Sequence, residues 1–452
     1  MRVLLTGLPI RSHLVPALVP LAKSLRRLGH EVAIATGGAR AAELEALGVE
    51  VLVLPDVLAP EQLAAKMPPG MLGGWRPEIS GPLSVPLFNH ESSAAFARNL
   101  LASGWQPDLI IRETNEYGGF LAADVLGVPF ATVDIAPLIV RLVPDLLERL
   151  NVLRGEFDLA PIGSLDQAYG RLTAGLLPEP WYHETRLGRR AYRTPAPVET
   201  LDPAVAELPA DGPLVLMSLG SNLGMLMSRE SELLPIAVEA LGSLPVRAVV
   251  ASGQDTWTGP RPANVHIVPY VQQNLLLGAC DAFVTHAGFS GVREALSAGV
   301  PMVAVPLFSD QPENASRLED LGLGIRIDVK GLNPDILADA VRRVLEVPSF
   351  RQAARGFQRR ILGLSALDTF AEDFAGRETS AEAGLPARSV LAMDTPPKPG
   401  EPPERPGPPP SFPRREPPPD APRQYPYETP TKYPGTRPPE FPPGVTPPSP
   451  ER

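Results

Sequence analysis

The chain has 452 residues, 44% of them hydrophobic, with one cysteine and a formal net charge of -10. This length allows two or three domains with sizeable cores, and the acidic balance disfavours sequence-independent binding to nucleic acid or an anionic membrane. The lone Cys280 excludes a disulfide framework and fits a reducing compartment. Neither a signal peptide nor an apolar run of about 18 residues is present, so we expect a cytoplasmic protein without a membrane span.

The first half of the chain alternates strand and helix patterns, and its strands are apolar on both faces. Such runs are typical of a parallel sheet covered by helices on each side. The less regular stretch Asp56–Gln106 is expected to be an insertion over the sheet. The predicted strands are Arg2–Thr6, Glu31–Thr36, Val49–Leu54, Leu109–Arg112 and Phe130–Val133, and the predicted helices are Leu14–Leu28, Ala39–Leu47 and Gly119–Leu126.

The second half restarts the same pattern after a Pro-rich link. The predicted strands are Leu214–Ser218, Arg247–Ala251, His266–Val268, Ala282–Thr285, Met302–Val305 and Gly324–Ile327. The helices expected between them are Ser231–Gly242, Leu275–Ala279, Gly291–Ala298, Pro312–Leu321 and Asn333–Val347. A helical segment over Phe350–Gly376 is expected to pack back on the first domain.

These patterns predict an α/β protein of two facing, Rossmann-like, doubly wound domains, with a ligand cleft at the carboxyl ends of both sheets. We place the first domain at 1–197, a linker at 198–213 and the second domain at 214–377. Residues 378–452 form a Pro-rich tail, and 24 of the chain's 57 prolines lie between Asp394 and Arg452. We expect the tail to be disordered, either as a spacer or as a docking segment that presents Pro439–Pro443 to a Pro-recognising partner.

A Gly-rich turn follows the apolar strand Ala282–Thr285 and opens a helix. Gly288 and Gly291 allow close approach to the backbone, and the first N–H groups of the helix favour an anion. His286, at the end of the strand, could add a hydrogen bond to a phosphate. Glu294 lies about two helical turns further along, where it could reach ribose hydroxyls. Taken alone this is a weak signal, because many such turns serve packing only.

The sequence around this turn is more specific. It runs from Val268-Pro269-Tyr270 through the Gly-rich turn to Pro306-Leu307-Phe308-Ser309-Asp310-Gln311 and on to Gly324. This block resembles the donor-binding signature of family 1 glycosyltransferases, which have two Rossmann domains in the GT-B fold and use nucleotide sugars. His13-Leu14-Val15-Pro16 and Arg27–Val32 extend the resemblance over about residues 1–374. Among subfamilies, the chain is most similar to bacterial macrolide and natural-product glycosyltransferases.

The resemblance implies a role for each matching residue. It implies that Tyr270 stacks on uracil, that the backbone of Val271 bonds the base and that Gln273 lies near the ribose. It places the diphosphate against His286 and the N–H groups of Gly291 and Val292. The remaining implied donor contacts are the ribose hydroxyls for Glu294, sugar hydroxyls for Asp310 and Gln311, and the diphosphate for Ser218 and Ser221.

Two departures from the family pattern bear on the donor. Gly291 and Val292 stand where many relatives carry a Ser or Thr, and only Ser290 retains a hydroxyl nearby. Tyr270 replaces the commoner Trp, so we expect weaker stacking on the base. A Glu at the position of Glu294 goes with UDP-sugars in the family, so the resemblance favours UDP-glucose.

His13 is the candidate catalytic base, in the predicted loop after the first strand. Its unperturbed pKa of about 6.5 suits removal of a hydroxyl proton near neutral pH. An oriented imidazole needs a carboxylate on its other nitrogen, and the resemblance implies one at Glu113, where Asp is usual. His13 could instead cap the following helix, and Glu113 could pair with a surface Arg. No His/Cys cluster has metal-ligand spacing and no Asp-x-Asp sequence is present, which fits a reaction without metal or other cofactor.

The sequence therefore predicts an inverting, metal-independent glycosyltransferase that moves a sugar from a UDP-sugar to a hydroxyl of a small hydrophobic acceptor such as a macrolide or polyketide. Two alternatives stay open. One is a nucleotide-sugar 2-epimerase, which shares the two-domain architecture. The other is a non-catalytic auxiliary protein on the same fold, with the tail as its docking element.

Overall fold

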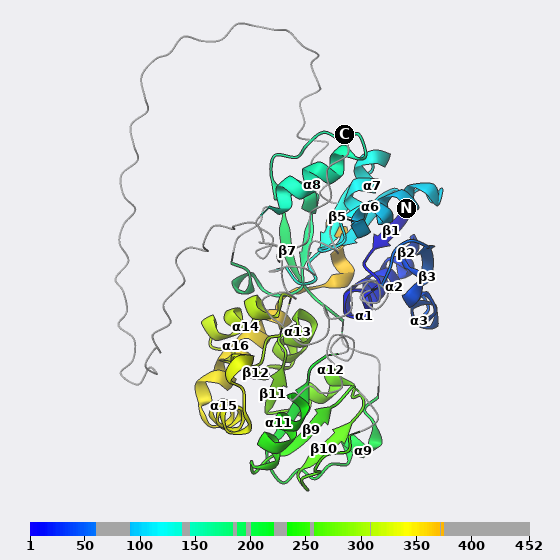
Figure 1. Ribbon diagram of the computed structural model, residues 1–452. Helices are drawn as coiled ribbons and strands as arrows, with labels where there is room; N and C mark the ends of the chain where they lie inside the picture. Colours follow the sequence, from blue (N-terminus) through cyan, green and yellow to red (C-terminus); the bar gives the residue numbers. More distant parts are fainter. Residues whose placement is uncertain are drawn as a thin grey trace, which may run out of the picture. The chain divides into compact units, whose positions relative to one another are not determined.

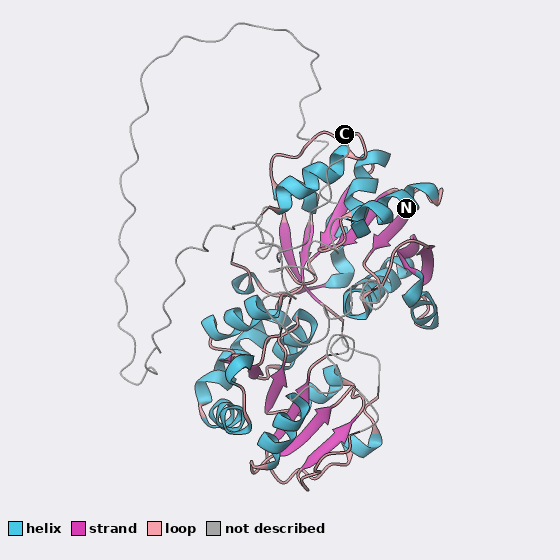
Figure 2. Cartoon of the chain, in the orientation of Figure 1, coloured by secondary structure: helices cyan, strands magenta, loops and turns pink. Residues whose placement is uncertain are grey.

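The computed structural model describes residues 1–59, 91–137, 145–183, 188–195, 200–220, 233–253, 257–307, 309–370 and 372–374 (Figure 1). The predicted Pro-rich tail, Ser221 and most of the predicted insertion lie outside these ranges. Helices flank two separate sets of strands in the part described (Figure 2).

The first sheet has eight strands in the order β14-β7-β6-β5-β4-β1-β2-β3, and every neighbouring pair is parallel. Its strands are β1 (Arg2–Thr6), β2 (Glu31–Gly37), β3 (Glu50–Leu54), β4 (Leu109–Glu113), β5 (Phe130–Val133), β6 (Thr173–Gly175), β7 (Arg189–Arg193) and β14 (Ser365–Ala366). The helices of this half are α1 (Arg11–His13), α2 (Val19–Arg27), α3 (Ala41–Ala46), α6 (Glu91–Ala102), α7 (Gly118–Leu126) and α8 (Leu146–Gly155).

The chain order of this sheet reverses between β1 and β4. Strands β2 and β3 extend it on one side of β1, and β4 to β7 extend it on the other. Thr6 at the end of β1 pairs in register with Arg112 near the end of β4. The loops that leave these two strands therefore start side by side at a topological switch point, where ligands bind in open α/β sheets.

The second sheet has the order β10-β9-β8-β11-β12-β13 and is also parallel throughout. Its switch point lies between β8 and β11. Its strands are β8 (Leu214–Ser218), β9 (Arg247–Ala251), β10 (Val265–Val268), β11 (Ala282–Thr285), β12 (Met302–Ala304) and β13 (Gly324–Arg326). The helices of this half are α9 (Pro203–Ala206), α11 (Leu233–Gly242), α12 (Gln273–Leu276), α13 (Phe289–Ala298), α14 (Gln311–Asp320), α15 (Pro334–Glu346) and α16 (Pro348–Leu362).

The last described segment returns to the first sheet. The helix predicted over Phe350–Gly376 is wrong in extent, because α16 ends at Leu362, beside Gly363. The short strand β14 then pairs with β7. Beyond it, Asp373 accepts a hydrogen bond from the hydroxyl of Tyr192 at 2.7 Å, and the buried ring of Phe370 packs edge-on against Tyr192.

The helix predicted over Leu14–Leu28 is also wrong in its start and its continuity. Helical structure begins at Arg11, passes through a wider π-helical turn at Leu14–Leu18 and continues as α2. Pro16 lacks the N–H that an α-helix would direct to the carbonyl of Ser12, which is a sufficient reason for the local change of pitch. His13 is therefore the last residue of a short helix, whereas the sequence placed it in a loop.

Strands β6 and β7 were not predicted. The strand β7 reads Arg-Arg-Ala-Tyr-Arg, so it lacks the apolar run that marks the central strands, and β6 has only three residues. A buried ion pair links the start of β7 to the end of β5, across the intervening β6: Arg189 Nε lies 3.1 Å from an oxygen of Asp134, which directly follows β5. Arg189 also lies over the Tyr182 ring, 4.0 Å from its centroid.

The Asp134–Arg189 pair predicts a large effect on stability. We expect Asp134→Ala to lower the free energy of unfolding by about 3–5 kcal/mol, because Arg189 would keep a buried charge without its carboxylate. The matched control is Asp145→Ala, which removes the partner of Arg149 in an exposed pair at 2.8 Å and should cost less than about 1 kcal/mol. Urea unfolding of both variants measures the difference. Equal losses would contradict the prediction.

Candidate active site

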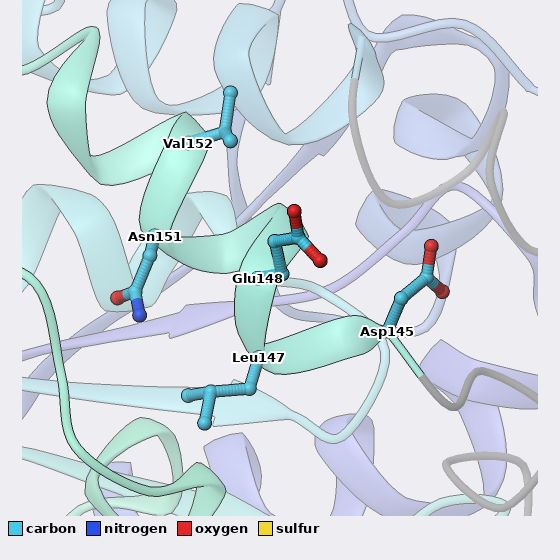
Figure 3. A pocket seen from close by; sticks show the side chains of 5 residues that line it. All are labelled: Asp145, Leu147, Glu148, Asn151 and Val152. Carbon is cyan, nitrogen blue, oxygen red and sulfur yellow. The ribbon is translucent and has the colours of Figure 1, made fainter.

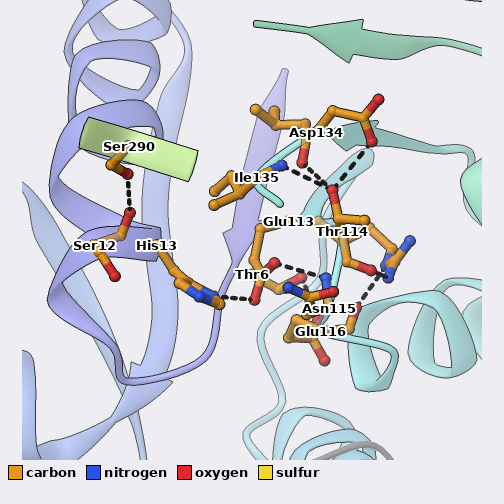
Figure 4. Close-up of polar contacts among 12 residues, drawn as sticks. Thr6, Ser12, His13, Glu113, Thr114, Asn115, Glu116, Asp134, Ile135 and Ser290 are labelled. Carbon is orange, nitrogen blue, oxygen red and sulfur yellow. Dashed lines mark hydrogen bonds and ion pairs between the residues drawn. The ribbon is translucent and has the colours of Figure 1, made fainter. Parts of the chain in front are cut away.

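The two candidate catalytic residues meet at the switch point of the first sheet. His13 Nδ1 lies 3.0 Å from Glu113 Oε1 (Figure 4). The Glu113 side chain is fully buried, whereas 16% of the His13 side chain is exposed. A carboxylate accepts the proton on Nδ1, so this geometry fixes the tautomer with a lone pair on Nε2. The ring can then accept a proton from a molecule on its open side.

Burial and charge act in opposite directions on this pair. Burial alone would lower the pKa of His13, but the charge and hydrogen bond of Glu113, with a further contribution from the charge of Asp310, leave that pKa above its ordinary value. Burial alone would raise the pKa of Glu113. The charge and hydrogen bond of His13, a hydrogen bond from the N–H of Asn115 and the charge of Arg112 hold it below the ordinary value. When His13 is protonated, Glu113 is therefore ionised, and the two side chains form an ion pair.

His286 and two glycines form the corresponding centre of the second sheet. His286 directly follows β11, and Gly220 lies just beyond β8. A Cβ on Gly220 would come within 2.7 Å of the imidazole ring, and a Cβ on Gly288 within 2.5 Å. Gly220 also has φ +77°, a conformation that L side chains rarely adopt. Both positions therefore need glycine to accommodate the ring.

The His286 ring is neutral at physiological pH. Burial lowers its pKa to about 4, and a hydrogen bond with the backbone of Ser218 opposes this only in part. A neutral imidazole can still donate one hydrogen bond. That single N–H serves either the backbone of Ser218 or a phosphate, so a contact with a diphosphate would replace the bond to Ser218 and would add no positive charge.

Helix α13 presents its N-terminus beside this ring, with Gly288 as the N-cap. The N–H of Val292 donates to the carbonyl of Gly288 at 3.1 Å, so it is already engaged within the helix, and its contact with a diphosphate stays a prediction. Val292 is four residues past the cap, where the helical ladder begins. The N–H groups of Ser290 and Gly291 precede the ladder and have no partner within the helix. An anion would meet these two groups and the positive end of the helix dipole.

Gln273 and Glu294 lie together, although 21 residues separate them. The side-chain amide of Gln273, at the start of α12, donates to Glu294 Oε2 on α13 at 2.8 Å. The structure thus brings together the two residues that the resemblance implied for a ribose. The Glu294 side chain retains 19% exposure and so remains open to a ligand.

Asp310 and Gln311 begin α14, at the end of the turn that follows β12, and both are buried. Burial raises the pKa of Asp310 despite a hydrogen bond from Asn314. The carbonyl of the Gln311 side chain accepts the N–H of Leu307 at 2.9 Å. The predicted contact of Gln311 with sugar hydroxyls would therefore have to use the other polar groups of its side chain.

Asn314 belongs to the candidate site, and the sequence analysis missed it. Its side-chain amide donates to Asp310 Oδ2 at 2.7 Å and to the carbonyl of Ala287 at 3.0 Å. It therefore ties the Asp310 carboxylate to the turn between His286 and Gly288. The signal available was its spacing, since residues i and i+4 share one face of a helix.

The other predicted donor residues differ in exposure. The Tyr270 ring follows β10 and is 58% exposed, as a stacking platform requires, whereas Val271 is buried and its carbonyl accepts the N–H of Gln273. Ser218 ends β8 beside the switch point. Ser221 lies outside the described residues.

Hydrogen bonds connect the two halves near these groups. The hydroxyl of Ser290, in the first turn of α13, donates to the carbonyl of Ser12 at 3.2 Å (Figure 4). Arg317 on α14 donates to the carbonyl of Trp181 at 3.0 Å. The peptide next to His13 is thus fixed to the helix that carries the anion site.

Elsewhere, a hollow lies on α8 (Figure 3). It is lined by Asp145, Leu147, Glu148, Asn151 and Val152, none of which belongs to the candidate site. Within the described ranges, no three His, Cys, Asp or Glu side chains are grouped as metal ligands would be. No helix in those ranges is long and apolar enough to cross a membrane.

Part of the chain matches known proteins in sequence. The family model described as UDP-glucoronosyl and UDP-glucosyl transferase matches residues 205–359. Rabbit (Oryctolagus cuniculus) UDP-glucuronosyltransferase 1A6 is 37% identical over 145 residues, which are 31% of this chain and 26% of the relative. The chain thus matches only about a quarter of the length of that relative.

Solved structures match over a greater length. The glycosyltransferase VinC in complex with DTDP has a TM-score of 0.64 at 26% identity, and the match covers 85% of this chain and 100% of VinC. The spinosyn rhamnosyltransferase SpnG complexed with thymidine diphosphate has a TM-score of 0.67 at 21% identity, over 83% of this chain and 100% of SpnG. Together these matches confirm the predicted fold, GT-B, and the resemblance of the donor half.

Proposed function

We propose, from the UDP-glucoronosyl and UDP-glucosyl transferase domain that residues 205–359 form within a GT-B fold, that this protein is an inverting glycosyltransferase. It transfers a sugar, glucose as our first choice, from a UDP-sugar to a hydroxyl of a small hydrophobic acceptor. The observation that carries the proposal is the 3.0 Å contact of the buried Glu113 carboxylate with Nδ1 of a partly exposed histidine, His13.

The acceptor side of the reaction follows from that contact. His13 Nε2 takes the proton of the acceptor hydroxyl while Glu113 accepts the hydrogen bond from Nδ1–H and stabilises the imidazolium. The acceptor oxygen forms a bond to the anomeric carbon as the bond from that carbon to the diphosphate oxygen breaks. The electron pair leaves with the diphosphate, and attack from the opposite face inverts the configuration.

The donor side supplies electrostatic stabilisation. Charge that develops on the leaving diphosphate meets the first N–H groups of α13 and the neutral imidazole of His286. We propose that these groups suffice without a bound metal, in keeping with a sequence that has no Asp-x-Asp motif. Activity should then survive treatment with EDTA.

The nucleotide preference rests on Glu294. Two carboxylate oxygens match the two vicinal hydroxyls of a ribose, and the neighbouring Gln273 amide keeps the carboxylate in place. Thymidine diphosphate, present in the SpnG structure, carries a deoxyribose and offers only one of those hydroxyls. We therefore propose UDP-sugars as donors. The acceptor class is supported by the name of SpnG, a spinosyn rhamnosyltransferase.

A thermal-shift titration tests the donor site. UDP at about 100 times its Kd should add ~2.7 kcal/mol to the free energy of unfolding, and dTDP should need a higher concentration for the same shift. Glu294→Ala should raise the Kd for UDP by about 10- to 100-fold, because it removes hydrogen bonds to a charged group.

The matched control is Glu319→Ala, which removes an exposed carboxylate from α14 and should leave the titration unchanged. A stronger response to dTDP than to UDP would contradict the proposed base and sugar. No response to any nucleoside diphosphate would overturn the donor site.

A further inference from the structure

A second carboxylate, Glu116, lies buried behind the His13–Glu113 pair. Glu116 is 1% exposed and comes three residues after Glu113, in the turn that connects β4 with α7. One of its oxygens accepts the hydroxyl of Thr6 at 2.5 Å (Figure 4). Both oxygens lie within hydrogen-bond distance of the N–H of Gly119, at 2.9 and 3.0 Å.

The local sequence is shaped around this carboxylate. A Cβ on Gly118 would come within 2.8 Å of one Glu116 oxygen, and a Cβ on Gly119 within 2.7 Å of the other. A Cβ on Gly119 would also lie 2.3 Å from the Thr6 hydroxyl. The two glycines therefore give the carboxylate room at the first turn of α7.

A buried arginine fixes the main chain of the same turn. Arg112 is fully buried, and its guanidinium donates to the carbonyls of Glu116 and Thr114 at 2.5 Å each. Its charge also opposes the rise that burial causes in the pKa of Glu116, which stands at about 7. The neighbouring negative charge of Glu113 adds to that rise.

The contact with Thr6 joins the two chain segments that carry the catalytic pair. Thr6 ends β1, seven residues before His13, and Glu116 follows Glu113 at the end of β4. Within the turn, Glu113 Oε2 accepts the N–H of Asn115 at 2.7 Å. Each oxygen of Glu113 thus has a hydrogen-bond partner. One contacts His13, and the other accepts from the backbone of Asn115, in the turn that Glu116 and Arg112 fix in place.

We propose that Glu116 is a positioning residue for the catalytic pair: by joining Thr6 to the start of α7 it holds the β4–α7 turn in the form that presents Glu113 to His13. The catalytic meaning of this role rests on the proposed function. The structural role of Glu116 does not depend on the proposed function, because it concerns only the contact between the side chains of His13 and Glu113.

Proton NMR of the His13 ring tests the proposal without substrate. The His13 signal is assigned by its loss in His13→Gln, and its titration midpoint in the full chain should lie above the ordinary 6.5. Glu113→Gln should lower that midpoint, because the negative partner is removed. Glu116→Ala should lower it as well, by about 0.5 pH unit or more, because Glu113 is no longer held against the ring. Adding Glu116→Ala to Glu113→Gln should bring no further fall.

Two milder variants keep the test valid where Glu116→Ala does not fold. Thr6→Val removes the hydroxyl donor with little change of shape and should shift the midpoint in the same direction. Glu116→Gln can still accept the N–H of Gly119 and should stay close to the wild type. The control is Asp145→Asn, which alters an exposed ion pair with Arg149 at the start of α8. It should leave the titration midpoint of His13 unchanged.

A folded Glu116→Ala or Thr6→Val chain with an unshifted midpoint would overturn the proposal. So would an equal additional fall in the Glu113→Gln background, since that result would show an effect independent of Glu113. Failure of glycosyl transfer in the wild type would instead count against the proposed function and leave these titrations interpretable.

Discussion

Replacing His13 with alanine should lower kcat for glycosyl transfer by about 10²- to 10⁴-fold, the usual contribution of a positioned general base. The KM for the nucleotide sugar should change little, because the donor contacts lie on the second sheet. His30→Ala is a matched control: this histidine precedes β2, and its Nδ1 lies 3.5 Å from the N-terminal amine. Steady-state kinetics with one UDP-sugar and one accepted acceptor measure both variants.

The pH dependence of the wild type follows from the same residue. His13 acts as a base only when it is neutral, so activity should rise with pH through its pKa. Glu113 holds that pKa above its ordinary value, so the acid limb of the kcat profile should lie above about pH 6.5. A profile that is flat across this range, or an active His13→Ala, would contradict the role of the base.

Replacing Glu113 with glutamine should lower kcat by at least about 10²-fold. The amide can no longer stabilise an imidazolium, and its NH₂ group favours the wrong tautomer of His13. The acid limb of the residual activity should move to lower pH, because the raised pKa of His13 depends on Glu113. A pH–rate series on this variant and the wild type measures both effects.

Glu113→Asp distinguishes the effect of the negative charge from the effect of the length of the side chain. It keeps the carboxylate but shortens the side chain by one methylene group, in a pocket where both Glu113 oxygens have partners at 3.0 and 2.7 Å. It should therefore retain more activity than Glu113→Gln and less than the wild type. Wild-type kinetics in Glu113→Gln would exclude an orienting role for this carboxylate.

The central strands could be predicted from the sequence because they are apolar on both faces. Runs such as Leu109–Arg112 and Ala282–Thr285 are recognisable without any knowledge of their neighbours. The contact of His13 with Glu113 follows almost directly, since adjacent parallel strands bring their carboxyl ends to one edge. The strands at one end of the first sheet lack this pattern: β7 is rich in arginine and β14 has only two residues, so neither could be predicted.

The details of the site depend on contacts between distant residues. Nothing in the spacing of Gln273 and Glu294 shows that they hydrogen-bond. The four-residue spacing of Asp310 and Asn314 indicates that they can meet, but nothing in the sequence indicates that Asn314 also bonds to the carbonyl of Ala287. Pro16 gave a local signal, yet the periodic leucines that follow predict one continuous helix. One proline does not interrupt the periodicity of the leucines. In the structure, however, its missing N–H removes a helical hydrogen bond and changes the local pitch.

The proline at position 16 has a consequence for the contact between the two halves of the chain. It leaves the carbonyl of Ser12, the residue before the base, able to receive the hydroxyl of Ser290 from the donor half. A single neutral hydrogen bond of this kind contributes only about 0.5–1.5 kcal/mol. Proline at position 16 thus lets the segment that carries the base contact the donor half through one weak hydrogen bond, which acts beside the contact of Arg317 with Trp181.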